Sequence, residues 1–156
     1  QGYRVAGAEL SELAIQQLFE ELAISPIIRN AGPLKHYHAP NIDMYVGDIF
    51  ELSDDVLGAV DATYDRAALV ALPDSMRAHY VSHLTALTGN ASQLLICFEY
   101  DQNLMDGPPF SIEASNVADC YKDRYDISLA SRAEVPGKLK GIVPALESAW
   151  HLTKPA

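Results

Sequence analysis

Short apolar segments alternate with amphipathic segments along the chain, a pattern that is typical of α/β proteins. Strands are expected at residues 3–8, 42–47, 60–64, 93–100, 125–133 and 145–154. The run from Leu94 to Phe98 is apolar throughout, which predicts a strand buried on both faces of a parallel sheet. The last two strands are expected to form an antiparallel hairpin that closes a mostly parallel sheet.

Helices are expected between these strands. One follows Ser11, a favoured N-cap residue, a short one begins near Ser53, and another opens at Pro73. Residues 111–122 are also expected to be helical. In the helix that opens at Pro73, the helical spacing of apolar residues predicts an inner stripe made of Met76, Tyr80, Leu84 and Leu87.

The segment 25–41 is expected to be irregular, because proline and glycine interrupt it at Pro26, Gly32, Pro33 and Pro40. Inside it, His36 and His38 alternate as in a short strand and could share a metal ion. No third ligand stands nearby in the sequence, so no metal site is expected.

Three acidic residues fall at the carboxyl ends of predicted strands, where open α/β sheets bind ligands. Glu9 could accept hydrogen bonds from the two ribose hydroxyls of a nucleotide-like cofactor, or simply favour the N-terminus of the next helix. Asp48, beside Ile49 and Phe50, could hold an adenine, or serve as a helix cap. Both interpretations stay open at each position.

The stretch from Ala62 to Leu69 carries the third acid, Asp65, followed by Arg66. The planar guanidinium suits a carboxylate or a delocalised anion, so the pair is a candidate ligand site. A strand-end ion pair that only tethers a loop is the alternative. Further along the chain, a substrate wall or a simple loop stiffener is expected at Pro108, Pro109 and Phe110.

Length and composition are compatible with one domain over residues 1–156. The net charge of −10 disfavours nucleic acid and anionic membrane as partners, and no run of 18 apolar residues is present. Cys97 and Cys120 form no Cys-x-x-Cys motif, and Cys97 is expected to be a buried thiol. No signal peptide is visible, so the cytoplasm is the default location. The chain begins without Met and enters a strand almost at once, so it is expected to be N-terminally incomplete.

Five segments together resemble the thiopurine S-methyltransferase family, most closely its bacterial branch. They are Gly7-Ala8-Glu9-Leu10-Ser11-Glu12, Gly47-Asp48-Ile49-Phe50, Tyr64-Asp65-Arg66-Ala67-Ala68-Leu69, Glu99-Tyr100-Asp101 and Gly107-Pro108-Pro109-Phe110. The resemblance runs in order from Tyr3 to Phe110 and is less clear beyond. It implies a Rossmann-like class I methyltransferase fold, S-adenosyl-L-methionine as cofactor, a small thiol substrate and a monomer.

Residue roles follow from the same resemblance. Glu9 would take the ribose hydroxyls, Asp48 and Ile49 the adenine, and Arg66 would sit where cofactor and acceptor meet. Asp65 would orient Arg66 or relay a proton. The substrate-side loop would be made of Pro108, Pro109 and Phe110. Family resemblance implies thiopurine acceptors, and bacterial relatives are linked to selenium and tellurium compounds.

Two departures from the family are visible. The family's first, central strand and its Pro-Leu-Cys-Gly-Lys loop lie before the position of Gln1, and the family's charged, Trp-containing stretch is not reproduced near Pro136–Gly141.

Two other functions fit the pattern of strands, acidic residues and helices. A nicotinamide-binding oxidoreductase domain would use Glu9 equally well, and a non-catalytic nucleotide-binding module would keep the fold without the complete cofactor loop.

Overall fold

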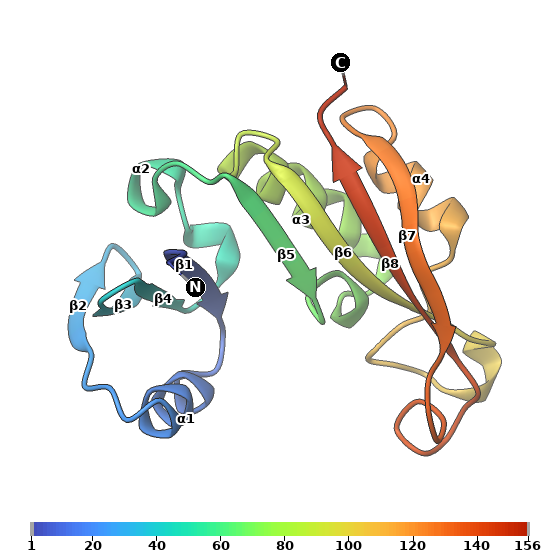
Figure 1. Ribbon diagram of the computed structural model, residues 1–156, viewed down its shortest axis with the longest axis horizontal. Coiled ribbons are helices and arrows are strands. Elements are labelled where there is room, and N and C mark those ends of the chain that lie inside the picture. Colours follow the sequence, from blue (N-terminus) through green and yellow to red (C-terminus); the bar gives the residue numbers. More distant parts are fainter. Residues whose placement is uncertain (1, 156) are drawn as a thin grey trace. The chain divides into compact units, whose positions relative to one another are not determined.

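The computed structural model of the protein describes residues 2–155. The chain divides into two compact units, an N-terminal unit of Gln1–Gly58 and a C-terminal unit of Ala59–Ala156. Figure 1 traces both. Each unit has its own four-stranded sheet.

The N-terminal unit has the sheet order β1-β4-β3-β2. Its elements are β1 (Val5–Glu9), α1 (Glu12–Glu21), β2 (Ile27–Ala31), β3 (Leu34–Ala39), β4 (Ile42–Val46), the 3₁₀ turn η1 (Ile49–Glu51) and α2 (Asp54–Leu57). Strands β1 and β4 are parallel, whereas β4, β3 and β2 form an antiparallel meander. Helix α1 begins after Ser11, whose hydroxyl accepts a hydrogen bond from the Ala14 N–H, as the sequence predicted.

Helix α1 covers one face of this sheet. Its buried Ile15 and Phe19 pack against Tyr37, Ala39 and Val46 of strands β3 and β4. The ring of Phe19 stacks on Tyr37, with centroids 6.0 Å apart. Since side chains alternate along a strand, residues 36, 38, 43 and 45 face the other side of the sheet.

The expectation that residues 25–41 are irregular is wrong. They form the β2–β3 hairpin, whose two-residue turn is Gly32-Pro33, with Gly32 in the left-handed region at φ +62°. Glycine at the first turn position is the signature of a tight hairpin turn. The next turn, Pro40-Asn41, places Asn41 at φ +63° and joins β3 to β4. The glycine and prolines therefore mark turns between strands here.

The C-terminal unit has the sheet order β5-β6-β8-β7. Its elements are β5 (Ala62–Arg66), η2 (Leu69–Ala71), α3 (Asp74–Leu87), β6 (Ser92–Glu99), η3 (Gln102–Leu104), α4 (Ala114–Tyr121), β7 (Asp126–Glu134) and β8 (Leu146–Thr153). Strands β5 and β6 are parallel, and β7 and β8 form the expected antiparallel hairpin. Across residues 2–155, two of the six strand pairs are parallel, so the sheets are mixed rather than mostly parallel.

Helices α3 and α4 lie behind this second sheet in Figure 1 and contact each other. The core between helices and sheet includes the fully buried Leu95 and Cys97 of β6 and Val117 of α4. One part of the predicted stripe of α3 is wrong, because Met76 is 40% exposed whereas Arg77 is 8% exposed. Burial of Arg77 is tolerated because its Nε donates to the Leu72 carbonyl and its Nη1 pairs with Asp74.

Candidate active site

Two of the predicted site residues lie at one edge of the N-terminal sheet. Glu9 ends β1 and Asp48 follows β4, and these strands run parallel with Glu9 opposite Val46. The Gly47 N–H donates to the Glu9 carbonyl at 3.0 Å and extends the pairing past the strand ends. The tertiary pairing therefore brings together two carboxylates that are about 40 positions apart in sequence.

Each of these carboxylates also caps a backbone N–H. Glu9 Oε1 accepts from the Ser11 N–H at 2.7 Å, and Asp48 Oδ1 accepts from the Phe50 N–H at 3.0 Å. A carboxylate has lone pairs on two oxygens, so one oxygen can fix the local turn while the other faces a ligand. Capping and ligand binding are thus compatible here.

Gly47 allows the chain to turn from β4 into Asp48. Its φ is +138°, a value that residues with a side chain rarely adopt. A Cβ at this position would lie 2.6 Å from Cδ2 of Leu34. Glycine is therefore required mainly by the backbone conformation, since the Leu34 side chain could move away from a Cβ but the φ of +138° would remain strained.

Asp65 and Arg66 are the last two residues of β5, two positions later than the predicted strand end, and successive strand side chains point to opposite faces. Asp65 is buried, with 3% of its surface exposed. Its Oδ2 accepts from the Tyr80 hydroxyl at 2.9 Å and its Oδ1 from the Leu69 N–H at 3.3 Å. Asp65 therefore anchors the turn after β5 to helix α3.

Burial raises the pKa of the Asp65 carboxyl above its usual range, and the hydrogen bonds from Tyr80 and Leu69 offset only part of that rise. Burial also raises the pKa of the Tyr80 hydroxyl, and the nearby carboxyl of Asp65 raises it further. Tyr80 consequently stays protonated and acts as a hydrogen-bond donor to Asp65.

Arg66 is exposed on the opposite face. Its Nη2 lies 3.6 Å from Oε2 of Glu147 on β8, and the two side chains are 57% and 42% exposed. This contact is a long, solvated ion pair, which holds the guanidinium loosely. Ala67, directly after it, has φ +71°, a conformation uncommon outside glycine. The guanidinium thus stays accessible to a ligand while the backbone beneath it is fixed.

The loop Gly107–Phe110 is held at three successive residues. The Lys140 ammonium donates to the Pro108 carbonyl at 2.6 Å, and the Tyr100 hydroxyl donates to the Pro109 carbonyl at 2.6 Å. The Phe110 N–H donates to the Val70 carbonyl at 2.6 Å. Both proline peptide bonds, at 107–108 and 108–109, are cis. Lys140, in the segment Pro136–Gly141 to which no role could be assigned from the sequence, therefore anchors this loop.

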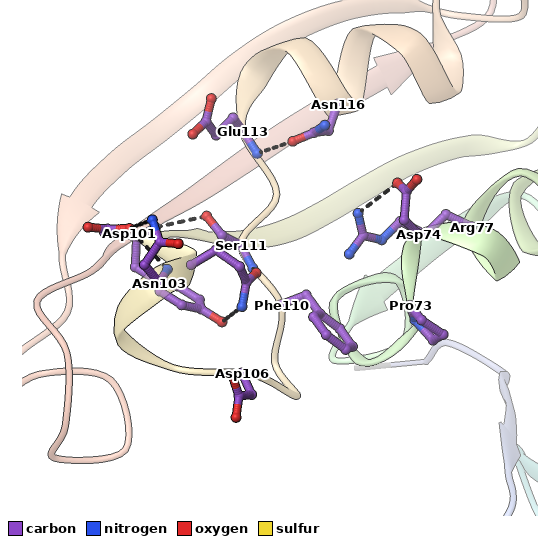
Figure 2. Close-up of a pocket in the computed structure, with 12 residues that line it drawn as sticks. Pro73, Asp74, Arg77, Asp101, Asn103, Asp106, Phe110, Ser111, Glu113 and Asn116 are labelled. Carbon is purple, nitrogen blue, oxygen red and sulfur yellow. Dashed lines mark hydrogen bonds and ion pairs between the residues drawn. The ribbon is translucent and has the colours of Figure 1, made fainter.

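A cavity of about 630 Å³ lies on the helix side of this loop, and Figure 2 shows its lining. Phe110 lines it and lies near Arg77, whose Cζ is 5.6 Å from the ring centroid. The lining also contains four carboxylates, those of Asp74, Asp101, Asp106 and Glu113. Pro108, Pro109 and Arg66 are not part of it. An acidic cavity with one arginine already paired to Asp74 is a poor place for a thiolate anion.

Comparison with known proteins identifies the family of this chain. The profile of the thiopurine S-methyltransferase family matches residues 1–154. Relatives of that name from Xanthobacter autotrophicus and Teredinibacter turnerae are each 50% identical over 154 residues. These matches cover 99% of this chain and 72% of each relative. The chain belongs to the thiopurine S-methyltransferase family.

Solved structures agree on the fold. An S-adenosylmethionine-dependent methyltransferase from Methanosarcina mazei has a TM-score of 0.66 at 15% identity, over 99% of this chain and 84% of its own. The Burkholderia thailandensis 1,6-didemethyltoxoflavin-N1-methyltransferase, solved with S-adenosylhomocysteine, has a TM-score of 0.60 at 16% identity, over 99% and 63%. The chain therefore has the class I methyltransferase fold, and its family membership makes it a methyltransferase. The nicotinamide and non-catalytic alternatives are set aside.

Sequence reasoning missed several residues that matter for this arrangement. Tyr80 was assigned only to the apolar stripe of α3, and Glu147 and Lys140 lie far along the chain from their partners. Asp43 was missed as a neighbour of the two histidines. It alternates with Ile42 and Met44 in β4, and a lone carboxylate inside an apolar strand is the signal that could have identified it.

No helix among residues 2–155 combines the length and the apolar character that crossing a membrane requires.

Proposed function

We propose that this methyltransferase transfers the methyl group of S-adenosylmethionine to the sulfur of thiopurines or of similar soft thiol, selenium or tellurium acceptors. Membership of the thiopurine S-methyltransferase family and the exposed Arg66 guanidinium support this acceptor class. An aromatic thiol ionises readily, so the protein needs to stabilise and place the thiolate rather than supply a strong base. A guanidinium offers several donors in a plane for that purpose.

The proposed cofactor site uses the hydrogen-bond acceptors at the edge of the N-terminal sheet. We propose that Glu9 accepts hydrogen bonds from the ribose hydroxyls and that Asp48 and Ile49 hold the adenine. Glu9 is half-buried and Asp48 exposed, and each keeps a carboxylate oxygen beyond the one that caps the backbone. When bound, the cofactor supplies a methyl group already activated on a sulfonium.

Residues of the C-terminal unit are proposed to bind and position the methyl acceptor. Arg66 binds and orients the acceptor as its thiolate. Asp65 acts as a positioning residue, because its bonds to Tyr80 and to the Leu69 N–H fix the turn from which Arg66 projects. On the acceptor side, the anchored loop presents Pro108, Pro109 and Phe110 as a rigid apolar wall that excludes water.

Both units are proposed to belong to one methyltransferase domain over residues 1–156, because the family match runs across both of them.

We also propose that the protein is a monomer and that it lies in the cytoplasm. Cys97 and Cys120 are both free thiols, which is usual for proteins of a reducing compartment. Sedimentation analysis of the purified protein tests the monomer, and a dimer would overturn it.

The acceptor role is tested by Arg66→Ala, with methyl transfer to a thiopurine as the readout. Loss of an electrostatic contact to a reacting group typically lowers turnover by about 10²- to 10³-fold. Arg132→Ala is the matched control, because Arg132 is also exposed and also pairs with a glutamate, Glu99. Equal activity of a folded Arg66→Ala variant and the parent protein would remove Arg66 from the mechanism.

Cofactor binding is tested separately by calorimetric titration of S-adenosylhomocysteine, with NADH as a control ligand. Glu9→Ala should weaken binding of the first ligand by about tenfold or more, since a charged acceptor is lost. Glu21→Ala, at the exposed end of α1, should leave it unchanged. Unchanged affinity in Glu9→Ala would mean that Glu9 serves only as a cap.

A further inference from the structure

Two imidazoles and a carboxylate meet on the face of the N-terminal sheet opposite helix α1. His36 and His38 are two residues apart on β3, so their side chains share a face. Asp43 of β4 lies directly across from His38 in the antiparallel ladder. Oδ1 of Asp43 is 2.7 Å from His36 Nε2 and 2.8 Å from His38 Nδ1.

The carboxylate of this cluster is oriented by its surroundings. Arg4 Nε donates to Oδ2 of Asp43 at 2.8 Å, which directs Oδ1 toward both imidazoles. Asp43 is only 2% exposed. Its two oxygens are therefore pre-aligned, with Oδ2 held by Arg4 and Oδ1 directed at the histidines.

The two histidines are oriented toward Asp43 and can be reached from solvent. The ring of His36 stacks on Tyr45, with centroids 4.6 Å apart and planes at 13°, which fixes its orientation. The side chains of His36 and His38 are 22% and 46% exposed, so the cluster can be reached from solvent. The three ligand atoms lie within 4.8 Å of one another.

We propose that His36 Nε2, His38 Nδ1 and Asp43 Oδ1 form a binding site for one divalent transition-metal ion of the zinc type. Two imidazole nitrogens and a carboxylate oxygen are a donor set that zinc accepts, and three protein ligands leave a position for water. Tetrahedral ligands at zinc bond lengths are roughly 3.3 Å apart. The two histidine nitrogens, now 2.7 and 2.8 Å from Asp43 Oδ1, would therefore each move about half an ångström away from it.

The ion takes the place of the protons that now bridge the cluster. Binding through His36 Nε2 puts the ring proton on Nδ1, and binding through His38 Nδ1 puts it on Nε2. Arg4 remains on Oδ2 as an outer partner that orients the ligating carboxylate. A bound ion would join β3 to β4 and stabilise the N-terminal unit by an amount that grows with the logarithm of the free ion concentration above its Kd.

A hydrogen-bonded cluster with no affinity for metal is the competing explanation, and zinc titration of the metal-free purified protein separates the two. Calorimetry with Zn²⁺ alone should give one ion per chain and a raised melting temperature. Co²⁺ should give the visible absorption bands of a four-coordinate site. Loss of an outer partner typically weakens binding about 10- to 100-fold, so His38→Gln, which removes a ligand, should weaken it about 100-fold or more.

His151→Gln is the matched control, because His151 is an exposed strand histidine outside the cluster. Circular dichroism confirms that each variant is folded. A measurement on the unmodified protein covers the case of an unfolded variant: zinc should protect His36 and His38, but not His151, from diethylpyrocarbonate. The absence of zinc binding, unchanged affinity in a folded His38→Gln variant, or no protection of these two residues would each overturn the proposal.

Discussion

The Tyr80 hydroxyl donates a 2.9 Å hydrogen bond to the buried carboxyl of Asp65, and the residue after Asp65 is the exposed Arg66. The buried pair and the exposed guanidinium share a backbone but face opposite sides of the sheet. Helix α3 can therefore influence the position of Arg66 without touching it. The alternative interpretation, an ion pair between Asp65 and Arg66, is wrong, because Asp65 bonds to Tyr80 and Leu69 whereas Arg66 pairs with Glu147.

Tyr80→Phe should destabilise the fold and lower methyl transfer. The substitution leaves a buried carboxyl without its donor, which costs about 1–3 kcal/mol of the free energy of unfolding. Tyr125→Phe is the control, because the Tyr125 hydroxyl is also buried but donates to a neutral carbonyl, that of Ala91. Urea unfolding measures the stability of both variants, and a methyl-transfer assay measures their activity. A smaller loss for Tyr80→Phe than for Tyr125→Phe would contradict the anchoring role of Asp65.

Asp65→Asn should change how stability depends on pH. The folded-state pKa of Asp65 is raised above its ordinary value of 3.8, so ionisation is disfavoured in the folded protein. Its contribution to stability is present below the unfolded pKa and is lost as the pH rises through the folded pKa. The stability of Asp65→Asn relative to the parent should therefore improve as the pH rises from about 4. Urea unfolding across pH measures this, and a difference that is constant with pH would contradict it.

Cys97 should resist thiol reagents until the protein unfolds. It is fully buried on β6, and burial raises the pKa of its thiol to about 12, so almost no thiolate forms near neutral pH. Cys120 is half-buried, and burial raises the pKa of its thiol as well, so it should react slowly but first. Mass spectrometry after alkylation distinguishes them. Cys120→Ser should show no labelling in the folded state, and rapid labelling of that variant would refute the assignment.

Lys140→Ala should loosen the loop that carries Phe110. The lost hydrogen bond to the Pro108 carbonyl is charge-assisted but exposed, so the expected effect is a rise of about three- to tenfold in KM for the thiopurine, with little change in kcat. Lys138→Ala is the control, as it removes the same charge from the same turn. Steady-state kinetics with saturating cofactor give both constants. Identical KM values for the two variants would show that the anchor is irrelevant to the acceptor.

The sequence by itself determined the elements whose patterns are local. The cap at Ser11, the start of a short helix after Ser53 and the terminal hairpin follow from local capping preferences and periodicity. The strand around Leu95 was also predicted, but it is not buried on both faces, because Leu94 is 39% exposed. Family membership was also readable, because five short motifs occur in order.

Only the tertiary structure decided which distant residues meet. Parallel pairing of β1 with β4 aligned Glu9 with Asp48, and pairing of β3 with β4 brought Asp43 to the two histidines. Periodicity also missed the inward turn of Arg77, because its burial depends on the Leu72 carbonyl and on Asp74 rather than on apolar spacing. Side-chain partners across strands and helices depend on register and packing, and one-dimensional pattern carries neither.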